Sequence, residues 1–160
     1  MNDSNLPAYS LSRLGRAVLD SVSEAIIYAD RDGAICFWNP GAERLFGFTA
    51  AEALGRSLDI ITPEPQRARH WAGFDRVMQT GESRYGHGDV LAVPAHRKDG
   101  TRISIEFTII PIRAEDGRIE GMMAILRDVT QRYEETRALK RELAALKASM
   151  DTSRASPGAG

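Results

Sequence analysis

The chain contains one cysteine, Cys36, and no run of about 18 consecutive apolar residues that could cross a membrane as a helix. A single thiol cannot close an internal disulfide, and it cannot supply a cysteine-rich zinc or iron–sulfur site. The N-terminus also lacks the basic stretch followed by an apolar segment that a secretory signal needs. These absences predict a cytoplasmic protein that has no membrane-spanning segment.

An excess of charge of either sign is missing as well. The 160 residues include 21 basic and 22 acidic side chains, for a net charge of -1. The chain as a whole therefore lacks the positive field that attracts phosphate backbones, and we expect no nucleic-acid partner. With 42% hydrophobic and 27% charged residues, the composition is that of a globular protein whose length suits one domain with one core.

Apolar periodicity divides the chain into a central domain, two flanking helices and two tails. Residues 1–10 and 151–160 have no apolar period, so we predict disordered tails there. Residues 11–23 repeat apolar side chains at helical spacing, which predicts an amphipathic flanking helix. Residues 24–130 then form the central domain, and residues 131–150 form a C-terminal helix.

Within the central domain, β-prone runs surround a group of short helices. The expected strands are 25–29, 34–38, 89–95, 101–112 and 118–126. The expected helices are 42–46, 50–54 and 66–79. Because the helices fall together between the second and third strands, this order predicts an α+β fold, in which a five-stranded antiparallel sheet carries the short helices on one face.

The C-terminal helix is expected to begin at Asp128, which could cap it together with Gln131. Farther along, four apolar residues recur at spacings of four, three and four: Leu139, Leu143, Leu146 and Met150. This seam of about two heptads is too short to hold a coiled coil alone, but it could extend a dimer that is held elsewhere. The seam therefore predicts a homodimer. The alternative is a surface helix that lies on its own domain.

Four motifs in order along the chain are typical of one family. They are the segment Phe37–Phe48, the turn Arg97–Thr101, Gly121 in the last strand, and Arg127–Thr130 before the final helix. Together they resemble the motifs of PAS domains, over a region from residue 21 to residue 130. This resemblance implies a five-stranded sheet with a cavity for a cofactor, a metabolite or a partner protein. It also implies that signals leave through the terminal helix, at the junction Asp128, Val129 and Thr130.

One residue of the helix predicted at 66–79 could carry chemistry, and it is His70. It falls on the same helical arc as Phe74 and Val77, so its imidazole should face the core or the cavity. The stretch Pro63–His70 resembles the one that leads to the proximal histidine of haem-binding PAS oxygen sensors. This resemblance implies that His70 is the axial ligand if haem is bound. The competing interpretation is a histidine packed in the core. The pocket candidates are His70, Phe74, Val77, Ile61 and Leu91.

Other residues leave the identity of the ligand open. Oxygen-sensing relatives carry an arginine about 20 residues after the proximal histidine, where this chain has residues 89–92 without an arginine; an apolar wall there would favour carbon monoxide or nitric oxide over dioxygen. His87 could be a sixth ligand or a turn residue, and His96 is expected in a solvated turn. The predicted helix 66–79 has no cysteine, which excludes the covalent flavin chemistry of light-sensing relatives. A noncovalent flavin or an apolar metabolite remains open.

The chain shows no motif of an enzyme: it has no Gly-x-Ser-x-Gly sequence and no glycine-rich phosphate loop. No histidine follows His96, so the C-terminal helix has no phosphoacceptor histidine. We therefore predict a non-catalytic sensory module that binds a small ligand or cofactor and signals through its C-terminal helix to a partner, such as a kinase or a transcription regulator. The alternative is a cofactor-free PAS scaffold for protein–protein interaction and dimerisation.

Overall fold

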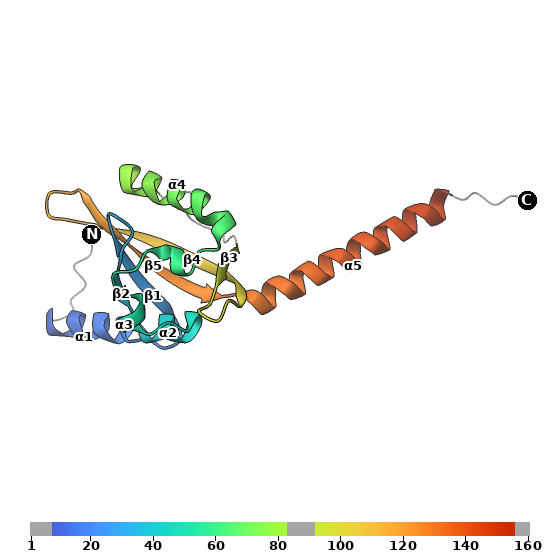
Figure 1. Ribbon diagram of the computed structural model, residues 1–160. Helices are drawn as coiled ribbons and strands as arrows, with labels where there is room; N and C mark the ends of the chain where they lie inside the picture. Colours follow the sequence, from blue (N-terminus) through green and yellow to red (C-terminus); the bar gives the residue numbers. More distant parts are fainter. Residues whose placement is uncertain (1–7, 83–91, 156–160) are drawn as a thin grey trace, which may run out of the picture. The chain divides into compact units, whose positions relative to one another are not determined.

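The structure is a computed structural model that describes residues 8–82 and 92–155. The chain divides into two units, one that ends at Asp128 and one that begins at Val129. The second unit contains the helix α5 (Thr130–Ala155). The first unit contains, in chain order, α1 (Ala8–Leu19), β1 (Ala25–Asp30), β2 (Ile35–Trp38), α2 (Pro40–Phe46), α3 (Ala50–Ala53), the 3₁₀ helix η1 (Leu58–Ile60), α4 (Glu64–Thr80), β3 (Val93–His96), β4 (Arg102–Arg113) and β5 (Ile119–Asp128) (Figure 1).

The five strands form one antiparallel sheet in the order β2-β1-β5-β4-β3 (Figure 1). The first strand of the chain therefore pairs with the last, from Ala25 opposite Leu126 to Asp30 opposite Gly121. On its other edge, β5 pairs with the long strand β4. This arrangement confirms the predicted α+β fold with a five-stranded antiparallel sheet, and it places β5 in the middle of the sheet.

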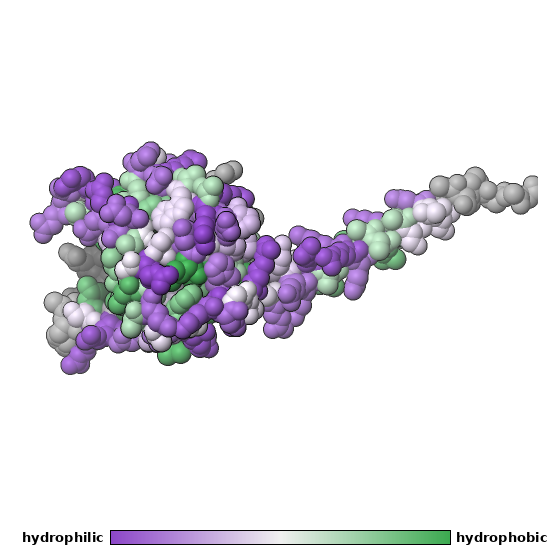
Figure 2. Space-filling model, viewed as in Figure 1, coloured by the Kyte–Doolittle hydropathy of each residue, from purple (hydrophilic) through white to green (hydrophobic). Residues whose placement is uncertain are grey.

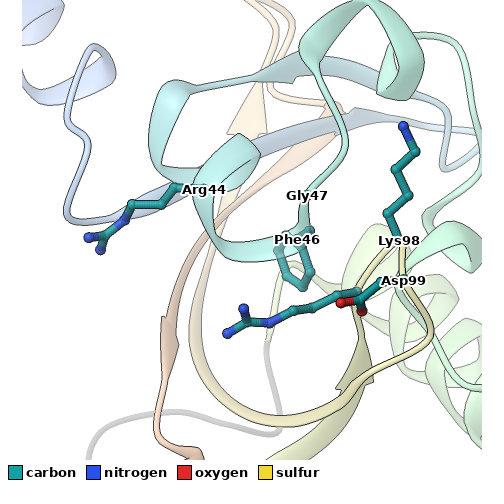
Figure 3. Close-up of a pocket in the computed structure, with 6 residues that line it drawn as sticks. Arg44, Phe46, Gly47, Lys98 and Asp99 are labelled. Atoms are coloured by element: carbon teal, nitrogen blue, oxygen red, sulfur yellow. The ribbon is translucent and has the colours of Figure 1, made fainter.

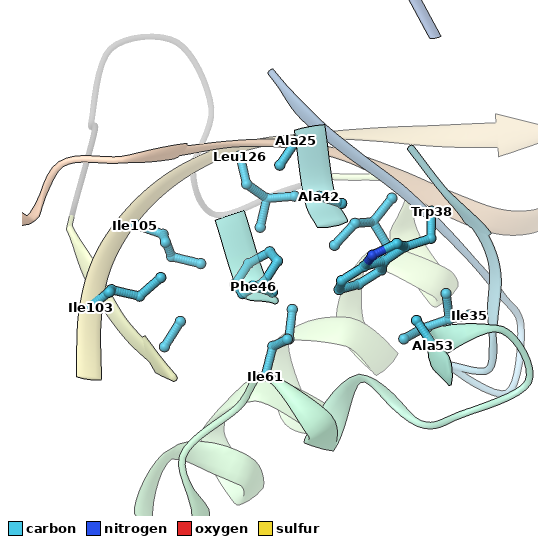
Figure 4. Close-up of a cluster of buried hydrophobic side chains, with 12 residues drawn as sticks. Ala25, Ile35, Trp38, Ala42, Phe46, Ala53, Ile61, Ile103, Ile105 and Leu126 are labelled. Atoms are coloured by element: carbon cyan, nitrogen blue, oxygen red, sulfur yellow. The ribbon is translucent and has the colours of Figure 1, made fainter. Parts of the chain in front are cut away.

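The main core lies between the sheet and the short helices that follow β2 (Figure 4). Phe46 of α2 and Ala53 of α3 are fully buried in it. This packing stabilises two helices that are too short to be stable alone. Ile103 and Ile105 of β4 are buried while Arg102 is exposed, because successive side chains of a strand point to opposite faces of the sheet. Around this core, polar side chains cover most of the visible surface of the first unit (Figure 2).

Several element boundaries differ from the sequence prediction. Helix α1 begins at Ala8 and α5 continues to Ala155, so both helices extend into the predicted tails. Neither added segment contains glycine or proline, and extending an existing helix needs only one hydrogen bond for each residue that is fixed. The predicted start of the last helix at Asp128 is wrong, because Asp128 is the last residue of β5. The Gln131 side chain donates to Glu135 of its own helix.

The side chain of Asn39 joins three segments of the first unit. It is 1% exposed, and its Oδ1 accepts hydrogen bonds of 2.8 Å from the backbone N–H groups of Ile26 in β1 and Ala42 in α2. Its Nδ2 donates to the backbone oxygens of Ser21 and Glu24, both at 2.9 Å. Asn39 therefore caps α2 and ties that helix to β1 and to the segment that enters β1.

Replacing Asn39 with alanine should lower the free energy of unfolding by about 3 kcal/mol or more, because it leaves two N–H groups and two carbonyl oxygens without their buried partner. Urea unfolding followed by circular dichroism measures this loss. The matched control is Cys36→Ala, at an exposed site on the neighbouring strand, which should change the free energy by less than about 0.5 kcal/mol. A loss of less than about 1 kcal/mol for Asn39→Ala would contradict this role.

Candidate functional site

Helix α4 carries the side chains of the predicted site on the face that it turns toward the sheet. The helix begins after Pro63, and Pro65 occupies its first turn, where a missing N–H costs no helical hydrogen bond. Farther along, Phe74 and Val77 are buried and pack with Ala29 of β1 and Met122 of β5. Apolar contacts with the two central strands therefore hold the C-terminal half of α4.

Polar contacts hold the N-terminal half of α4 against η1. The indole Nε1 of Trp71 donates to Asp59 Oδ1 at 2.9 Å. Arg67 Nε lies 3.8 Å from the same oxygen and donates to the backbone oxygen of Thr62 at 3.2 Å. The Trp71 ring also lies so close to Gly33, in the β1–β2 turn, that a Cβ atom there would overlap it. Together these contacts fix the helix turn that carries His70.

His70 lies one helical turn before Phe74, on the same face of α4. Its ring centroid is 4.9 Å from that of Trp71 and 6.5 Å from that of Phe74. Its Nδ1 is buried and has no hydrogen-bond partner among the described residues. Burial lowers the pKa of His70 below 6.5, and the negative charge of Asp59 opposes this shift only in part. The imidazole is therefore held in its neutral form, which is the form that ligates metals and haem iron.

A second polar atom on the same face of α4 was missed by the sequence analysis. Gln66 precedes His70 by four residues, and its Oε1 is also buried without a partner in the described structure. Residues four apart lie side by side on a helix, so the two unpartnered atoms belong to neighbouring side chains. The spacing was readable from the sequence. The burial of its Oε1 could not be read from the sequence, because glutamine is mostly an exposed residue.

The structure brings together only part of the predicted pocket. His70, Phe74 and Val77 share the inner face of α4, as predicted. Ile61 is buried instead in the main core, with Ala95 and Ile103. Leu91, His87 and residues 89–91 of the expected distal wall lie outside the described residues.

The prediction of a solvated turn at His96 is wrong. His96 is the last residue of β3, pairs with Arg102 of β4 and donates its backbone N–H to Ile61 at 3.0 Å. The turn forms one residue later, at Arg97–Gly100, because the glycine there adopts a positive φ of 85°.

A shallow hollow of about 430 Å³ lies at the end of α2, and His70 is not among the residues that line it (Figure 3). Its wall includes Phe46, Lys98 and Asp99, and the backbone N–H of Lys98 donates to Phe46 at 2.8 Å. Arg97 also lines the hollow, and its Nη2 forms an ion pair of 2.9 Å with Asp128 at the end of β5. The turn after β3 is thus linked to Asp128, the last residue of β5.

Neither the hollow nor the rest of the described chain shows a built metal site. No cluster of three histidine, cysteine or acidic side chains that could hold a metal ion occurs within residues 8–82 and 92–155. In the same residues, no helix is long and apolar enough to cross a membrane. Three buried side-chain atoms have no hydrogen-bond partner among the described residues: Nδ1 of His70, Oε1 of Gln66 and Nε of Arg97.

Comparisons with known proteins agree with this fold. The model of the PAS fold family matches residues 19–134. Sensor protein FixL of Bradyrhizobium diazoefficiens is 32% identical over 129 residues, which cover 80% of this chain and 25% of that protein. Oxygen sensor protein DosP of Escherichia coli is 27% identical over 126 residues, covering 77% of this chain and 15% of that protein. The crystal structure of a PAS domain from Colwellia psychrerythraea superimposes with a TM-score of 0.66 at 24% identity, covering 76% of this chain and 98% of that one.

The sheet order and the helices on it define an α+β sensory domain that is homologous to domains of sensor proteins. The chain belongs to the PAS family. It spans a quarter or less of the length of the curated relatives that it matches.

The burial of His70 should make the stability of the domain depend on pH. Burial lowers the pKa of His70 in the folded state, so below about pH 6.5 the unfolded chain binds a proton at this residue more readily than the folded chain does. The free energy of unfolding therefore falls as the pH decreases. Urea unfolding between pH 8 and pH 5 should show a steeper loss for the native protein than for His70→Gln, by up to about 1.4 kcal/mol for each pH unit. Equal slopes for the two proteins would show that His70 is not held neutral.

Proposed function

We propose that this PAS domain is the non-catalytic sensory part of a signalling protein. It binds a small ligand or cofactor against the inner face of α4 at His70, and it relays the change through β5 and α5 to a partner such as a kinase or a transcription regulator. The observation that carries the proposal is the buried Nδ1 of His70, which has no partner among the described residues.

An unpartnered buried polar atom costs about 1–3 kcal/mol, and buried polar groups of native proteins are usually satisfied. A bound molecule that bonds to His70 would recover this cost. The unpartnered Oε1 of the neighbouring Gln66 is a second buried atom on this face of α4 that a ligand could bond to. A second, polar contact at Gln66 would also distinguish such a ligand from a purely apolar metabolite.

Haem is the first cofactor to test. His70 is held neutral by burial, and the aromatic rings of Trp71 and Phe74 adjoin it, as suits an axial ligand beside an apolar ring system. DosP, with which this chain is 27% identical, is named an oxygen sensor. Haem bound at His70 would supply an iron that takes up a diatomic gas, while the protein would hold and orient the group.

The relay is proposed to run through Asp128, Val129 and Thr130. Strand β5 ends at Asp128 and α5 begins at Thr130, so a single residue separates the strand from the helix. The ion pair of Asp128 with Arg97 attaches this end of β5 to the β3–β4 turn. A shift of the central strand would therefore reach α5 without a flexible linker to absorb it.

Dimerisation through α5 is part of the same proposal. The four seam residues Leu139, Leu143, Leu146 and Met150 are 52–65% exposed, which leaves an apolar stripe open to a second copy. Helix α1 exposes a second stripe of apolar residues, Leu11, Leu14 and Val18, which could supply the contact that holds the dimer elsewhere.

A cofactor-free scaffold is the second candidate function. It is favoured by the close packing of Phe74 and Val77 against Ala29 and Met122, which fills the space beneath that half of α4. In this case the domain would serve only to bind a partner protein and to dimerise.

Haemin added to the purified protein should give a Soret band that shifts when carbon monoxide is added, and His70→Ala should abolish it because the axial ligand is lost. The matched control is His96→Ala, which should keep the band, since His96 contributes its backbone to β3. A spectrum without specific haemin uptake would contradict haem binding. If native mass spectrometry then detects no copurified small molecule, the scaffold function is supported instead.

Replacing Leu143 with glutamate should weaken dimerisation, because it puts a charge into the seam. Sedimentation velocity at several protein concentrations should show a dimer Kd raised at least about tenfold. The control is Ala145→Glu, which adds the same charge two residues away, outside the seam. An unchanged dimer Kd for Leu143→Glu would contradict the proposal that the α5 seam holds the dimer.

A further inference from the structure

Helix α4 holds two buried polar atoms that have no hydrogen-bond partner among the described residues, Nδ1 of His70 and Oε1 of Gln66. Gln66 precedes His70 by four residues, so the two side chains are neighbours on one face of the helix. The two atoms are chemically complementary, because an amide oxygen accepts hydrogen bonds and a protonated imidazole nitrogen donates one. Each atom is therefore a possible partner for the other.

The tautomer of His70 decides what its ring can bind. A neutral imidazole carries a proton on one nitrogen and a lone pair on the other, and the hydrogen bond made by one nitrogen fixes the form of both. Burial lowers the pKa of His70, so the neutral ring prevails at neutral pH. Because Nδ1 is buried, a proton on this nitrogen needs an acceptor.

The groups around His70 leave Gln66 as that acceptor. Asp59 acts on the pKa of His70 through its charge. Its Oδ1, however, already accepts the indole N–H of Trp71 at 2.9 Å and lies 3.8 Å from Nε of Arg67. Oε1 of Gln66 has no such partner within the described residues.

The oxygen of Gln66 and the nitrogen of His70 do not form a hydrogen bond in the structure. The terminal torsion of a glutamine side chain has a broad range of allowed angles. A rotation of the amide can therefore bring Oε1 toward Nδ1 while the backbone of α4 stays in place. Such a bond satisfies both buried atoms at once.

We propose that Gln66 is a positioning residue, which accepts the Nδ1–H proton of His70 and so keeps the lone pair on Nε2. This inference rests on the ligand site proposed above and adds the chemistry that the site selects. A ligand that meets the ring at Nε2 has to accept an electron pair or donate a hydrogen bond. It is a metal centre such as haem iron, or a molecule with an N–H or O–H group, and it does not meet the ring with a carboxylate or carbonyl oxygen.

Nitrogen NMR of the full chain with isotope-labelled histidine tests the tautomer without any ligand. At about pH 8, couplings to the carbon-bound ring protons show which nitrogen carries the proton. The native protein should show the Nδ1–H form at His70. Gln66→Leu, which has no hydrogen-bonding atom, should shift the ring toward the Nε2–H form. The matched control is Gln79→Leu at an exposed site of the same helix, which should leave the tautomer unchanged.

Two further variants separate hydrogen bonding from packing. Gln66→Glu keeps an acceptor oxygen, so it should retain the Nδ1–H form, and its negative charge should raise the pKa of His70 above that in the native protein. Asp59→Asn keeps an oxygen for the Trp71 indole and should leave the tautomer unchanged. An Nε2–H ring in the native protein would overturn the proposal. A tautomer that responds to Asp59→Asn and not to Gln66→Leu would also overturn it.

Haemin titration extends the test to a ligand. Gln66→Leu should raise the haemin Kd roughly tenfold or more, because a partner that orients a ligating histidine typically contributes that much to affinity. Gln79→Leu should leave the Kd unchanged.

The two proposals fail in different ways. A native chain that shows the Nδ1–H form but takes up no haemin contradicts haem binding and supports the role of Gln66. Haemin uptake whose Kd is the same for Gln66→Leu overturns the role of Gln66 and leaves the ligand site in place.

Discussion

The buried amide of Asn39 is the interaction on which the rest of the domain depends. It satisfies backbone groups of the segment before β1, of β1 itself and of the first turn of α2, all with one 1% exposed side chain. None of these segments is long enough to be stable alone. By joining them, Asn39 sets where α2 leaves the sheet, so that Phe46 enters the core and the later helices follow from there.

Helix α4 is attached to this frame in two different ways, and the difference places His70 at a boundary. Apolar packing with β1 and β5 holds its C-terminal half, whereas the polar contacts of Asp59 hold its N-terminal half. His70 lies where the two meet, beside aromatic rings but without a hydrogen-bond partner in the described structure. A ligand that bonded to this ring would act on a helix packed against the two central strands, which is the arrangement that the proposed sensor needs.

Strand β5 gives such a change a route out of the domain. It lies between β1 and β4, packs through Met122 against α4, and ends at Asp128, with one residue between it and the start of α5. Arg97 holds the end of the strand through an ion pair. The apolar seam of α5 is exposed in the described chain, and the proposed dimer would cover it.

The sequence by itself determined the order of most helices and strands, the arc that carries His70 and the apolar spacing of the α5 seam, because each depends on periodicity and turn residues within a short segment. Four motifs in the sequence also indicated the PAS family. Only the tertiary structure decided that β5 lies between β1 and β4, that Ile61 belongs to the main core, that Oε1 of Gln66 is buried, and that Arg97 pairs with Asp128. These features depend on contacts between residues far apart in the chain, or on which neighbours exclude water, and no local pattern encodes either.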